Sequence, residues 1–356
     1  FGFDFLKEYY NKVEEIRSNL LYDIDGVVFK VNSFYNQEIL GNRSKSPRWA
    51  IAGKLKAQQA VTKVLNIDIS VGRLGALTPV AKLDPVLVGG VVISNATLHN
   101  EDEVIKKDVR IGDYVLIQRA GDVIPEVVKV IQEKRNHNNV QFKMPNHCPI
   151  CNGEVLRIQN EAEYKCQNKD CIAKIKGSIQ HYVSKSCMNI DGLGEKIINQ
   201  LVEKNIIKSI DQIFTLNKNQ LSNLEKLGDK SAKNLLNAIE NSKITSFPRF
   251  IYALGIRNVG EHTSKILAKF FNNNLIKFQE TSFNTLIEID EIGPIVANSI
   301  ISFWSNNVNK ITIKNCLNNG VKLDKIGSTI SQKLSEKTFV FTGSMKKFKR
   351  KEAKDL

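Results

Sequence analysis

Ile190-Asp191-Gly192-Leu193-Gly194 has the form apolar-x-x-apolar-Gly, and this five-residue phrase occurs four times in the second half of the chain. The other three copies end at Gly228, Gly260 and Gly293, so successive final glycines lie 32 to 34 residues apart. Apolar residues follow each glycine at helical spacing, as at positions 197, 198, 201 and 202. The repeat therefore predicts four units of helix, tight glycine turn and helix within residues 174–328.

Each repeated glycine is expected to open the second helix of its unit. A helix N-terminus carries unpaired N–H groups and partial positive charge, so a glycine turn leading into it suits a phosphate group. Tetratricopeptide and ankyrin repeats have similar periods, but their consensus residues are absent. A helical domain that packs without DNA is the alternative. Basic residues near the turns favour DNA: Lys230, Lys233, Lys243, Arg257, Lys265 and Lys269.

Four of the six cysteines cluster in a short segment of the chain. Cys148-Pro149-Ile150-Cys151 forms one Cys-x-x-Cys knuckle, and Cys166 and Cys171 supply a second pair. Four thiolates can close a tetrahedron around Zn²⁺ and leave no position for water, which predicts one structural zinc. Four reduced core thiols are the alternative, but proline and asparagine flank the first knuckle. The remaining polar and thiol candidates are expected to be surface or packing residues: His147, His181, Cys187 and Cys316.

The charge balance points to a polyanionic partner. Lys and Arg number 51 against 37 Asp and Glu, a net charge of +14, which favours nucleic acid. A merely soluble basic protein is the alternative. The longest apolar stretch, residues 86–93, is far shorter than the ~20 residues of a membrane span, and no secretory signal is visible. We therefore expect no membrane association.

The first half of the chain shows strand patterns in place of the helical repeat. Residues 26–32 alternate as a strand after an Asp25-Gly26 turn, and Lys30 faces away from Phe29. Residues 48–54 form a second short apolar strand that also ends in a lysine, Lys54. We expect these two cationic strand ends to serve one phosphate ester.

These motifs together resemble the NAD-dependent DNA ligases of bacteria over nearly the whole chain. Residues 25–30 and 49–54 are similar to motifs IV and V of the covalent nucleotidyltransferases, and residues 71–73, 96–100, 110–113 and 119–125 are similar to OB-fold segments of the ligases. The four-cysteine zinc finger and the helix-hairpin-helix units follow in the family order. Residues 339–343 resemble the start of a BRCT domain.

The resemblance implies a multidomain α+β fold with a β-barrel and an all-α region. Its domains would be the end of an adenylation domain (1–57), an OB fold (58–144), a four-cysteine zinc finger (145–173), four helix-hairpin-helix repeats (174–328) and a truncated BRCT start (335–356).

The implied reaction is nick sealing in duplex DNA through lysyl-AMP and DNA-adenylate intermediates, in replication and repair. NAD⁺ would donate AMP, Mg²⁺ or Mn²⁺ would assist, and the protein would be a cytoplasmic, nucleoid-associated monomer. By family position, Arg17, Asp25 and Lys30 would line the adenylate and nicotinamide-nucleotide pocket, and Lys54 would lie near the AMP phosphate. The implied DNA contacts are Arg73, Arg119, Val123 and Ile124 of the OB fold, with Gly194, Gly228, Gly260 and Gly293 of the hairpins.

The chain departs from the family pattern at three places. Gly53 stands where motif V usually has an aromatic residue, and Leu74 replaces a threonine near the nick. The nucleophilic Lys-x-Asp-Gly does not occur. We expect that lysine upstream of Phe1, so the chain would be a ligase fragment that cannot adenylylate itself.

Two other functions fit parts of the pattern. A non-catalytic repair scaffold could join a zinc finger to hairpin repeats, but it would not need Asp25, Lys30 and Lys54. An ATP-dependent ligase shares the lysine motifs, whereas the zinc finger followed by four hairpins favours the NAD-dependent branch.

Overall fold

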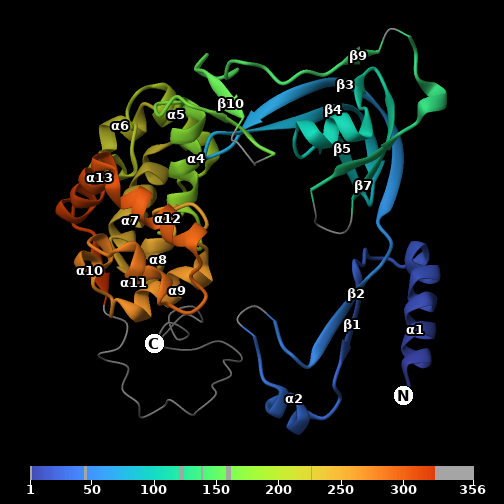
Figure 1. Cartoon of the computed structure of the whole chain (residues 1–356), viewed down its shortest axis with the longest axis horizontal. Helices are drawn as coiled ribbons and strands as arrows, with labels where there is room; N and C mark the ends of the chain where they lie inside the picture. The colour runs from blue at the N-terminus through green and yellow to red at the C-terminus, as the bar shows by residue number, and fades with distance from the viewer. Residues whose placement is uncertain are drawn as a thin grey trace.

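The computed structural model describes residues 2–43, 46–119, 124–137, 139–157, 162–225 and 227–324. The segment expected to begin a BRCT domain lies outside these residues. Figure 1 shows the described parts following one another along an open arc, with the helical region at one end and the N-terminal elements at the other. No described helix is both long and apolar enough to cross a membrane.

The N-terminal part is a helix beside a two-stranded ribbon. Helix α1 (Phe3–Ile16) and the 3-10 turn η1 (Arg17–Asn19) precede β1 (Gly26–Lys30), α2 (Phe34–Leu40) and β2 (Ala50–Lys54). The two strands pair antiparallel, with Gly26 opposite Lys54 and Lys30 opposite Ala50. Gly26 is required by close packing, because a Cβ there would lie 2.5 Å from the Gly53 carbonyl oxygen.

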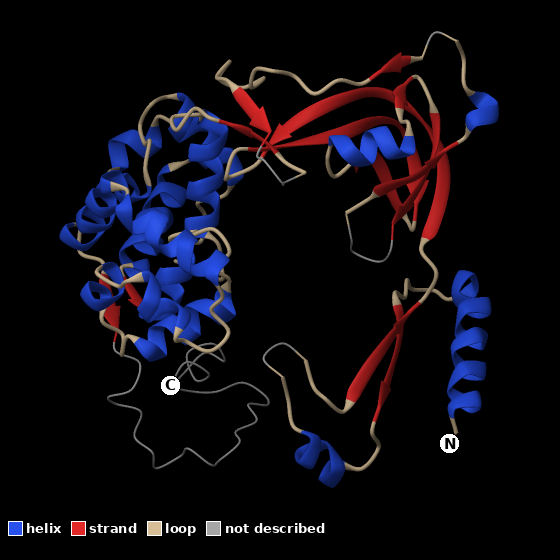
Figure 2. Cartoon of the chain, viewed as in Figure 1, coloured by secondary structure: helices blue, strands red, loops and turns tan. Residues whose placement is uncertain are grey.

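A five-stranded barrel follows the ribbon. Strands β3 (Gln58–Val71), β4 (Ala76–Val88), β5 (Val91–Thr97), β7 (Tyr114–Arg119) and β8 (Glu126–Val130) form the order β4-β3-β7-β8-β5, and β5 returns to pair with β4. Their alternating apolar residues fill the interior, where Val64, Val115, Ile117 and Val127 are fully buried. The sheet is thereby closed, as Figure 2 shows.

The short elements α3 (Glu101–Lys107), β6 (Arg110–Ile111), η2 (Gln132–Lys134) and β9 (Val140–Gln141) lie against the barrel. A buried ion-pair network attaches them. The Asp113 carboxylate is fully buried and accepts from Arg135 Nε at 2.9 Å and Nη2 at 2.7 Å, from Asn139 Nδ2 at 2.6 Å and from the Arg110 backbone N–H at 2.8 Å. Arg135 also bonds Asp108. Since an unpaired buried carboxylate is costly, these partners fix the segment after β8.

A small ribbon joins the barrel to the helices. Strands β10 (Val155–Arg157) and β11 (Tyr164–Cys166) pair with each other, and β11 also pairs with β4 of the barrel. Helix α4 (Ile172–Val183) starts directly after Cys171. The ribbon is therefore continuous with the barrel sheet on one side and with the helical region on the other.

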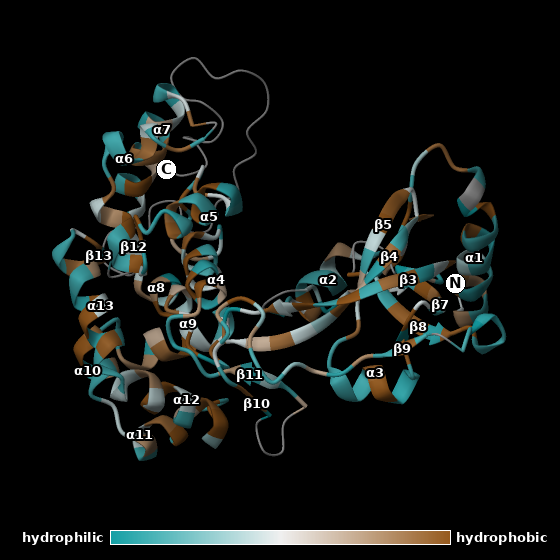
Figure 3. Ribbon diagram, turned by 90° about the horizontal axis from the view of Figure 1, so that it is seen from above, coloured by the Kyte–Doolittle hydropathy of each residue, from teal (hydrophilic) through white to brown (hydrophobic). Residues whose placement is uncertain are grey.

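The helical region shares one apolar core, and its buried side chains come from almost every element of the region. Figure 3 shows brown apolar segments along helices whose other faces are teal, the pattern of amphipathic helices that bury one stripe. The elements are α5 (Glu195–Glu203), η3 (Ile210–Thr215), α6 (Lys218–Ser222), α7 (Asp229–Ser242), β12 (Ile244–Ser246), α8 (Phe247–Ala253), α9 (Glu261–Phe270), α10 (Leu275–Gln279), α11 (Phe283–Ile287), α12 (Pro294–Ser305), α13 (Asn307–Asn318) and β13 (Lys322–Asp324). The expected α+β architecture with a barrel, a cysteine cluster and helical hairpins is confirmed.

Candidate nucleic-acid interface and metal centre

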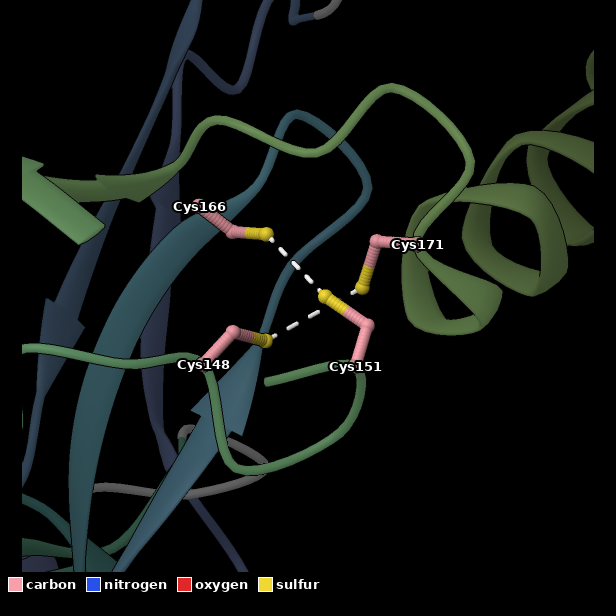
Figure 4. A group of neighbouring side chains, drawn as sticks. All are labelled: Cys148, Cys151, Cys166 and Cys171. Carbon is pink, nitrogen blue, oxygen red and sulfur yellow. Dashed lines mark hydrogen bonds between the residues drawn. The ribbon is translucent and has the colours of Figure 1, made fainter. Parts of the chain in front are cut away.

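The four clustered cysteines converge on one point. Figure 4 shows their sulfurs turned toward one another, and all four sulfur atoms lie within 4.8 Å of each other. Cys148 and Cys171 are 3.9 Å apart at sulfur, and Cys151 and Cys166 are 3.5 Å apart. Four sulfurs at the Zn–S distance of about 2.3 Å from one ion would be separated by about 3.8 Å. The cluster thus has the dimensions of a closed tetrahedral zinc site.

Backbone groups of the knuckles point at these sulfurs. Burial alone would raise the pKa of the Cys151 thiol, but the Gly153 backbone N–H and neighbouring groups lower it to about 7. The Ala173 and Lys174 backbone N–H groups at the start of α4 also bond to Cys171, but burial outweighs them and raises the pKa of that thiol. Gly153 leaves room for this arrangement, because a Cβ there would lie 2.8 Å from the Asn168 Cβ. Such donors stabilise thiolates and therefore favour a bound metal.

The other predicted packing residues agree with the structure. Cys187 and Cys316 are fully buried. His181 is half-buried, its Nε2 lies 2.8 Å from the Tyr252 carbonyl oxygen, and His147 is exposed.

The repeated phrase has one structural role at each position. Its first and fourth residues anchor the turn in the core, as Ile256 and Val259 do with exposures of 3% and 6%. The third residue adopts positive φ in three of the copies: Gly192 at 87°, Asn258 at 62° and Glu291 at 69°. The third position of the second copy, residue 226, lies outside the described residues.

The final glycine of each phrase lies at the start of the second helix of its hairpin. Gly194, Gly228, Gly260 and Gly293 have φ between −75° and −88° and are the N-caps of α5, α7, α9 and α12. A Cβ at any of the four would meet no atom of the chain within 4 Å. Neither backbone strain nor internal packing therefore requires glycine there. None of the four helices has a side-chain cap, which leaves their N-termini open to an outside partner.

Neighbouring helices in the same region are capped in the ordinary way. Side chains of Asn217, Asn274, Ser282 and Asn306 accept from backbone N–H groups at the starts of α6, α10, α11 and α13. Asn, Asp and Ser are the preferred N-caps because they satisfy these N–H groups. Among the described helices of this region, glycine caps occur at the second helix of each hairpin, although α8 also lacks a side-chain cap.

The hairpins are joined in two pairs by matching contacts. In the first pair, Gln200 of α5 exchanges hydrogen bonds of 3.2 and 2.7 Å with the backbone of Glu225 in the second turn. In the second pair, Asn258 of the third turn donates to Ser299 of α12 at 3.2 Å. Gln200 and Ser299 each lie six residues after their own hairpin glycine. Equivalent positions of two hairpins thus make the contact within each pair.

The two predicted lysines occupy the ends of the β1–β2 ribbon. Because the strands are antiparallel, Lys30 and Lys54 lie at opposite ends, four residues or roughly 14 Å apart along the strands. That the two lysines serve one phosphate ester stays a prediction. Paired and alternate residues share a face, however, so both lysine side chains project from the same side of the ribbon. A ligand between them would meet both cations.

Helix α1 is fastened to the Lys54 end of the ribbon. Tyr10 donates to the Lys54 carbonyl oxygen at 2.6 Å, and Arg17 Nη1 donates to the Lys56 carbonyl oxygen at 2.9 Å. The Tyr10 ring lies 3.3 Å from the position of a Cβ at Gly53. An aromatic side chain from α1 therefore covers the position where motif V usually has its own aromatic. Asp25 is exposed, and its carbonyl oxygen accepts from the Leu55 N–H at 3.0 Å.

The predicted barrel contacts lie in three different settings. Ile124 is 72% exposed, and Arg119 ends β7 opposite Gln58. Val123 lies outside the described residues. Arg73, in the turn between β3 and β4, is half-buried against the helical region. The sequence predicted neither the contact of Arg73 with the helical region nor the Asp113 network, although Asp113 lies within residues 110–113, which resemble an OB-fold segment of the ligases.

Five stretches of the chain match known protein families. Residues 2–58 match the NAD-dependent DNA ligase adenylation domain, 61–139 its OB-fold domain, and 147–173 its C4 zinc finger domain. Residues 186–241 match a SAM-like helix-hairpin-helix tandem and 249–313 a helix-hairpin-helix motif. The two hairpin matches coincide with the two pairs described above.

Curated relatives carry the name DNA ligase. The chain is 48% identical over 352 residues to that of Hahella chejuensis and 48% identical over 349 residues to that of Syntrophus aciditrophicus, in each case over 98% of this chain. The protein of Geobacter sulfurreducens is 47% identical over 348 residues. The chain spans about half the length of these relatives, between 51% and 52%.

Proposed function

We propose that this chain belongs to an enzyme that seals nicks in duplex DNA, because three of its segments match NAD-dependent DNA ligase domains and two helix-hairpin-helix matches follow them. NAD⁺ is the AMP donor, and a divalent cation, Mg²⁺ or Mn²⁺, assists in-line attack at phosphorus. Replication and repair supply the nicks, and the protein acts as a cytoplasmic monomer. The proposed domain limits are those expected from the sequence.

The four open glycine caps are the observation that supports DNA binding by this chain. A phosphate at a helix N-terminus is stabilised by free N–H groups and the helix dipole. Glycine allows the backbone of a second molecule to approach more closely than any side chain would. Two pairs of such turns suit the two strands of a duplex, and contacts of this kind read no base sequence.

The two lysines of the β1–β2 ribbon support the proposed role in adenylyl transfer. Lys30 and Lys54 project from one face and would neutralise charge on the adenylate phosphate, while Asp25 and Arg17 hold the Lys54 end of the pocket. The chain contains no Lys-x-Asp-Gly nucleophile. Its proposed role is therefore to position and neutralise, not to form the covalent bond to AMP.

The barrel is proposed to touch DNA beside the nick through Arg119, Val123 and Ile124. An exposed apolar side chain such as Ile124 suits insertion against a minor-groove base step. Arg73 reaches DNA in this proposal only by leaving its place against the helical region.

A salt titration tests the proposed DNA binding by the hairpin turns. Nicked duplexes of two unrelated sequences should bind this chain equally, and the logarithm of affinity should fall by nearly one unit of slope per phosphate contact against the logarithm of salt. Strong preference for one sequence, or affinity indifferent to salt, would refute it.

A second test addresses the chemistry. In the complete enzyme, Lys54→Ala or Lys30→Ala should raise the barrier to adenylyl transfer by on the order of 3 kcal/mol while circular dichroism stays unchanged. The chain alone should not become labelled by NAD⁺. A non-catalytic scaffold, the second candidate, predicts that neither lysine matters to sealing by the complete protein.

A further inference from the structure

The turn between β3 and β4 enters the helical region. Arg73 at its tip lines a cavity of about 190 Å³ together with residues from four different helical segments: Ser178, His181, Gly255, Phe303 and Thr312. The barrel therefore contacts the hairpin region directly, in addition to the link through the cysteine ribbon.

Two glycines of the helical region make room for this side chain. Gly177 lies inside helix α4, and a Cβ there would be 3.0 Å from the Arg73 Cα and 3.1 Å from its Cβ. A Cβ at Gly255 would be 2.1 Å from Arg73 Nη1. Glycine inside a helix costs about 1 kcal/mol relative to alanine, so Gly177 is unfavourable for α4 itself. The docked turn gives a physical reason for it.

Packing, not ion pairing, keeps Arg73 in this place. Among the described residues, no hydrogen bond or ion pair holds its guanidinium. Burial lowers the pKa of Arg73, and nearby Tyr252 and Cys187 partly offset that effect. The adjacent turn residue Gly75 is equally close to α4, since a Cβ there would meet Lys174 Cε at 2.4 Å. Arg73 and Gly75 of this turn thus both approach α4 closely.

We propose that this turn is a joint that fixes the orientation of the barrel relative to the hairpin region before any DNA is bound. Arg73 acts as a positioning residue whose Cα and Cβ occupy the space left by Gly177 and whose guanidinium lies in the space left by Gly255. The joint adds to the connection that the cysteine ribbon and the start of α4 provide between the two regions. The inference does not depend on the proposed function, because it concerns the protein without DNA.

Small-angle X-ray scattering of the zinc-loaded, DNA-free chain tests the joint. Arg73→Ala and Gly177→Ala should broaden the distribution of interatomic distances and increase the maximum dimension. Gly177→Ala is the sharper variant, because alanine favours the isolated helix and any loss must come from the contact with the turn. Arg73→Met keeps a side chain of similar length and should retain the wild-type profile. Gly194→Ala is the matched control, since its Cβ would meet no atom of the chain.

Circular dichroism and zinc content establish that each variant is folded. Gly255→Ala is the less suitable variant, because the φ of +66° at Gly255 disfavours alanine and can itself prevent folding. Gly177→Ala therefore tests the joint. Profiles of Arg73→Ala and Gly177→Ala that superimpose on the wild type would overturn the joint. An Arg73→Met chain as extended as Arg73→Ala would contradict its origin in packing.

Discussion

The cysteine knuckles and the hairpin turns both contain glycine, yet they differ in what the turn faces. In the knuckles the N–H of Gly153 meets a sulfur of the same chain, and Gly153 itself is tightly packed. At the hairpin glycines, such as Gly260, no atom of the chain lies within 4 Å of an added Cβ. The first kind of turn serves the fold, and the second is the one that we propose to serve a partner.

This difference separates effects on stability from effects on binding. A change in the knuckle should alter the free energy of unfolding whether or not DNA is present. A change at a hairpin glycine should leave that free energy almost unchanged and weaken DNA binding. The comparison fails if both regions respond in the same way.

The largest expected effect is loss of the metal. Structural zinc sites of this type contribute roughly 10 kcal/mol or more of binding free energy to folding. Cys171→Ser, or removal of zinc by a chelator, should therefore unfold the ribbon between barrel and helices. Metal analysis should find one zinc per chain, and correctly folded protein without zinc would contradict the closed-site interpretation.

A second large effect is expected in the barrel, away from both kinds of turn. Asp113→Ala leaves Arg135 without its buried partner and should cost about 3 to 5 kcal/mol in unfolding experiments. Burial would raise the pKa of Asp113, but the hydrogen bonds from Arg135, Asn139 and Arg110 lower it overall.

The lowered pKa gives this network a definite dependence on pH. Its stabilisation is complete above the ordinary Asp pKa of about 3.9 and is lost as the pH falls through the lower value of the folded state. Wild type should therefore lose stability below about pH 4 more steeply than Asp113→Ala. Parallel curves for the two proteins would show that Asp113 is not the group responsible.

Gly153→Ala should have an intermediate effect. The added Cβ would lie 2.8 Å from the Asn168 Cβ and 3.3 Å from the Cys151 sulfur. Overpacking of this kind costs about 1 to 3 kcal/mol. Gly260→Ala is the matched control and should cost less, at most about 1 kcal/mol, because only the weaker N-cap preference of alanine opposes it. Equal losses in the two variants would remove the distinction between the two kinds of glycine.

The smallest effect concerns the third position of the hairpin phrase. Glu291 adopts φ +69°, which a β-branched side chain disfavours. Glu291→Ile should cost about 1 to 2 kcal/mol, while Glu291→Gly should be nearly neutral. Urea unfolding measures both, and a stable isoleucine variant would show that this turn is not held at positive φ.

The order of the regions could be predicted from the sequence because the regions have different residue patterns. The phrase ending at Gly194 repeats about every 33 residues, and Cys148 and Cys151 have the spacing of metal ligands. The barrel strands were less visible from pattern alone and depended on resemblance. The Asp113–Arg135 pair joins residues 22 apart in sequence, which no local pattern reveals.

The arrangement of site residues was harder to foresee. Lys30 and Lys54 each end a strand, but only the antiparallel register shows that these ends lie apart. The resemblance implied a DNA contact for Arg73, whereas its docking against the helical region depends on Gly177 and Gly255, which are distant in sequence and have no motif of their own. Contacts between regions depend on the packed structure and are not encoded in one segment.

The most direct test of the central claim is a chain in which Gly194, Gly228, Gly260 and Gly293 are all replaced by alanine. Its affinity for a nicked duplex should be measured at several salt concentrations beside its unfolding curve. We expect an unfolding midpoint close to that of the wild type, much weaker DNA binding and a shallower dependence of affinity on salt, because phosphate contacts are lost. Unchanged DNA affinity, or loss of the fold with the glycines, would contradict the conclusion that these glycines serve an outside phosphate backbone.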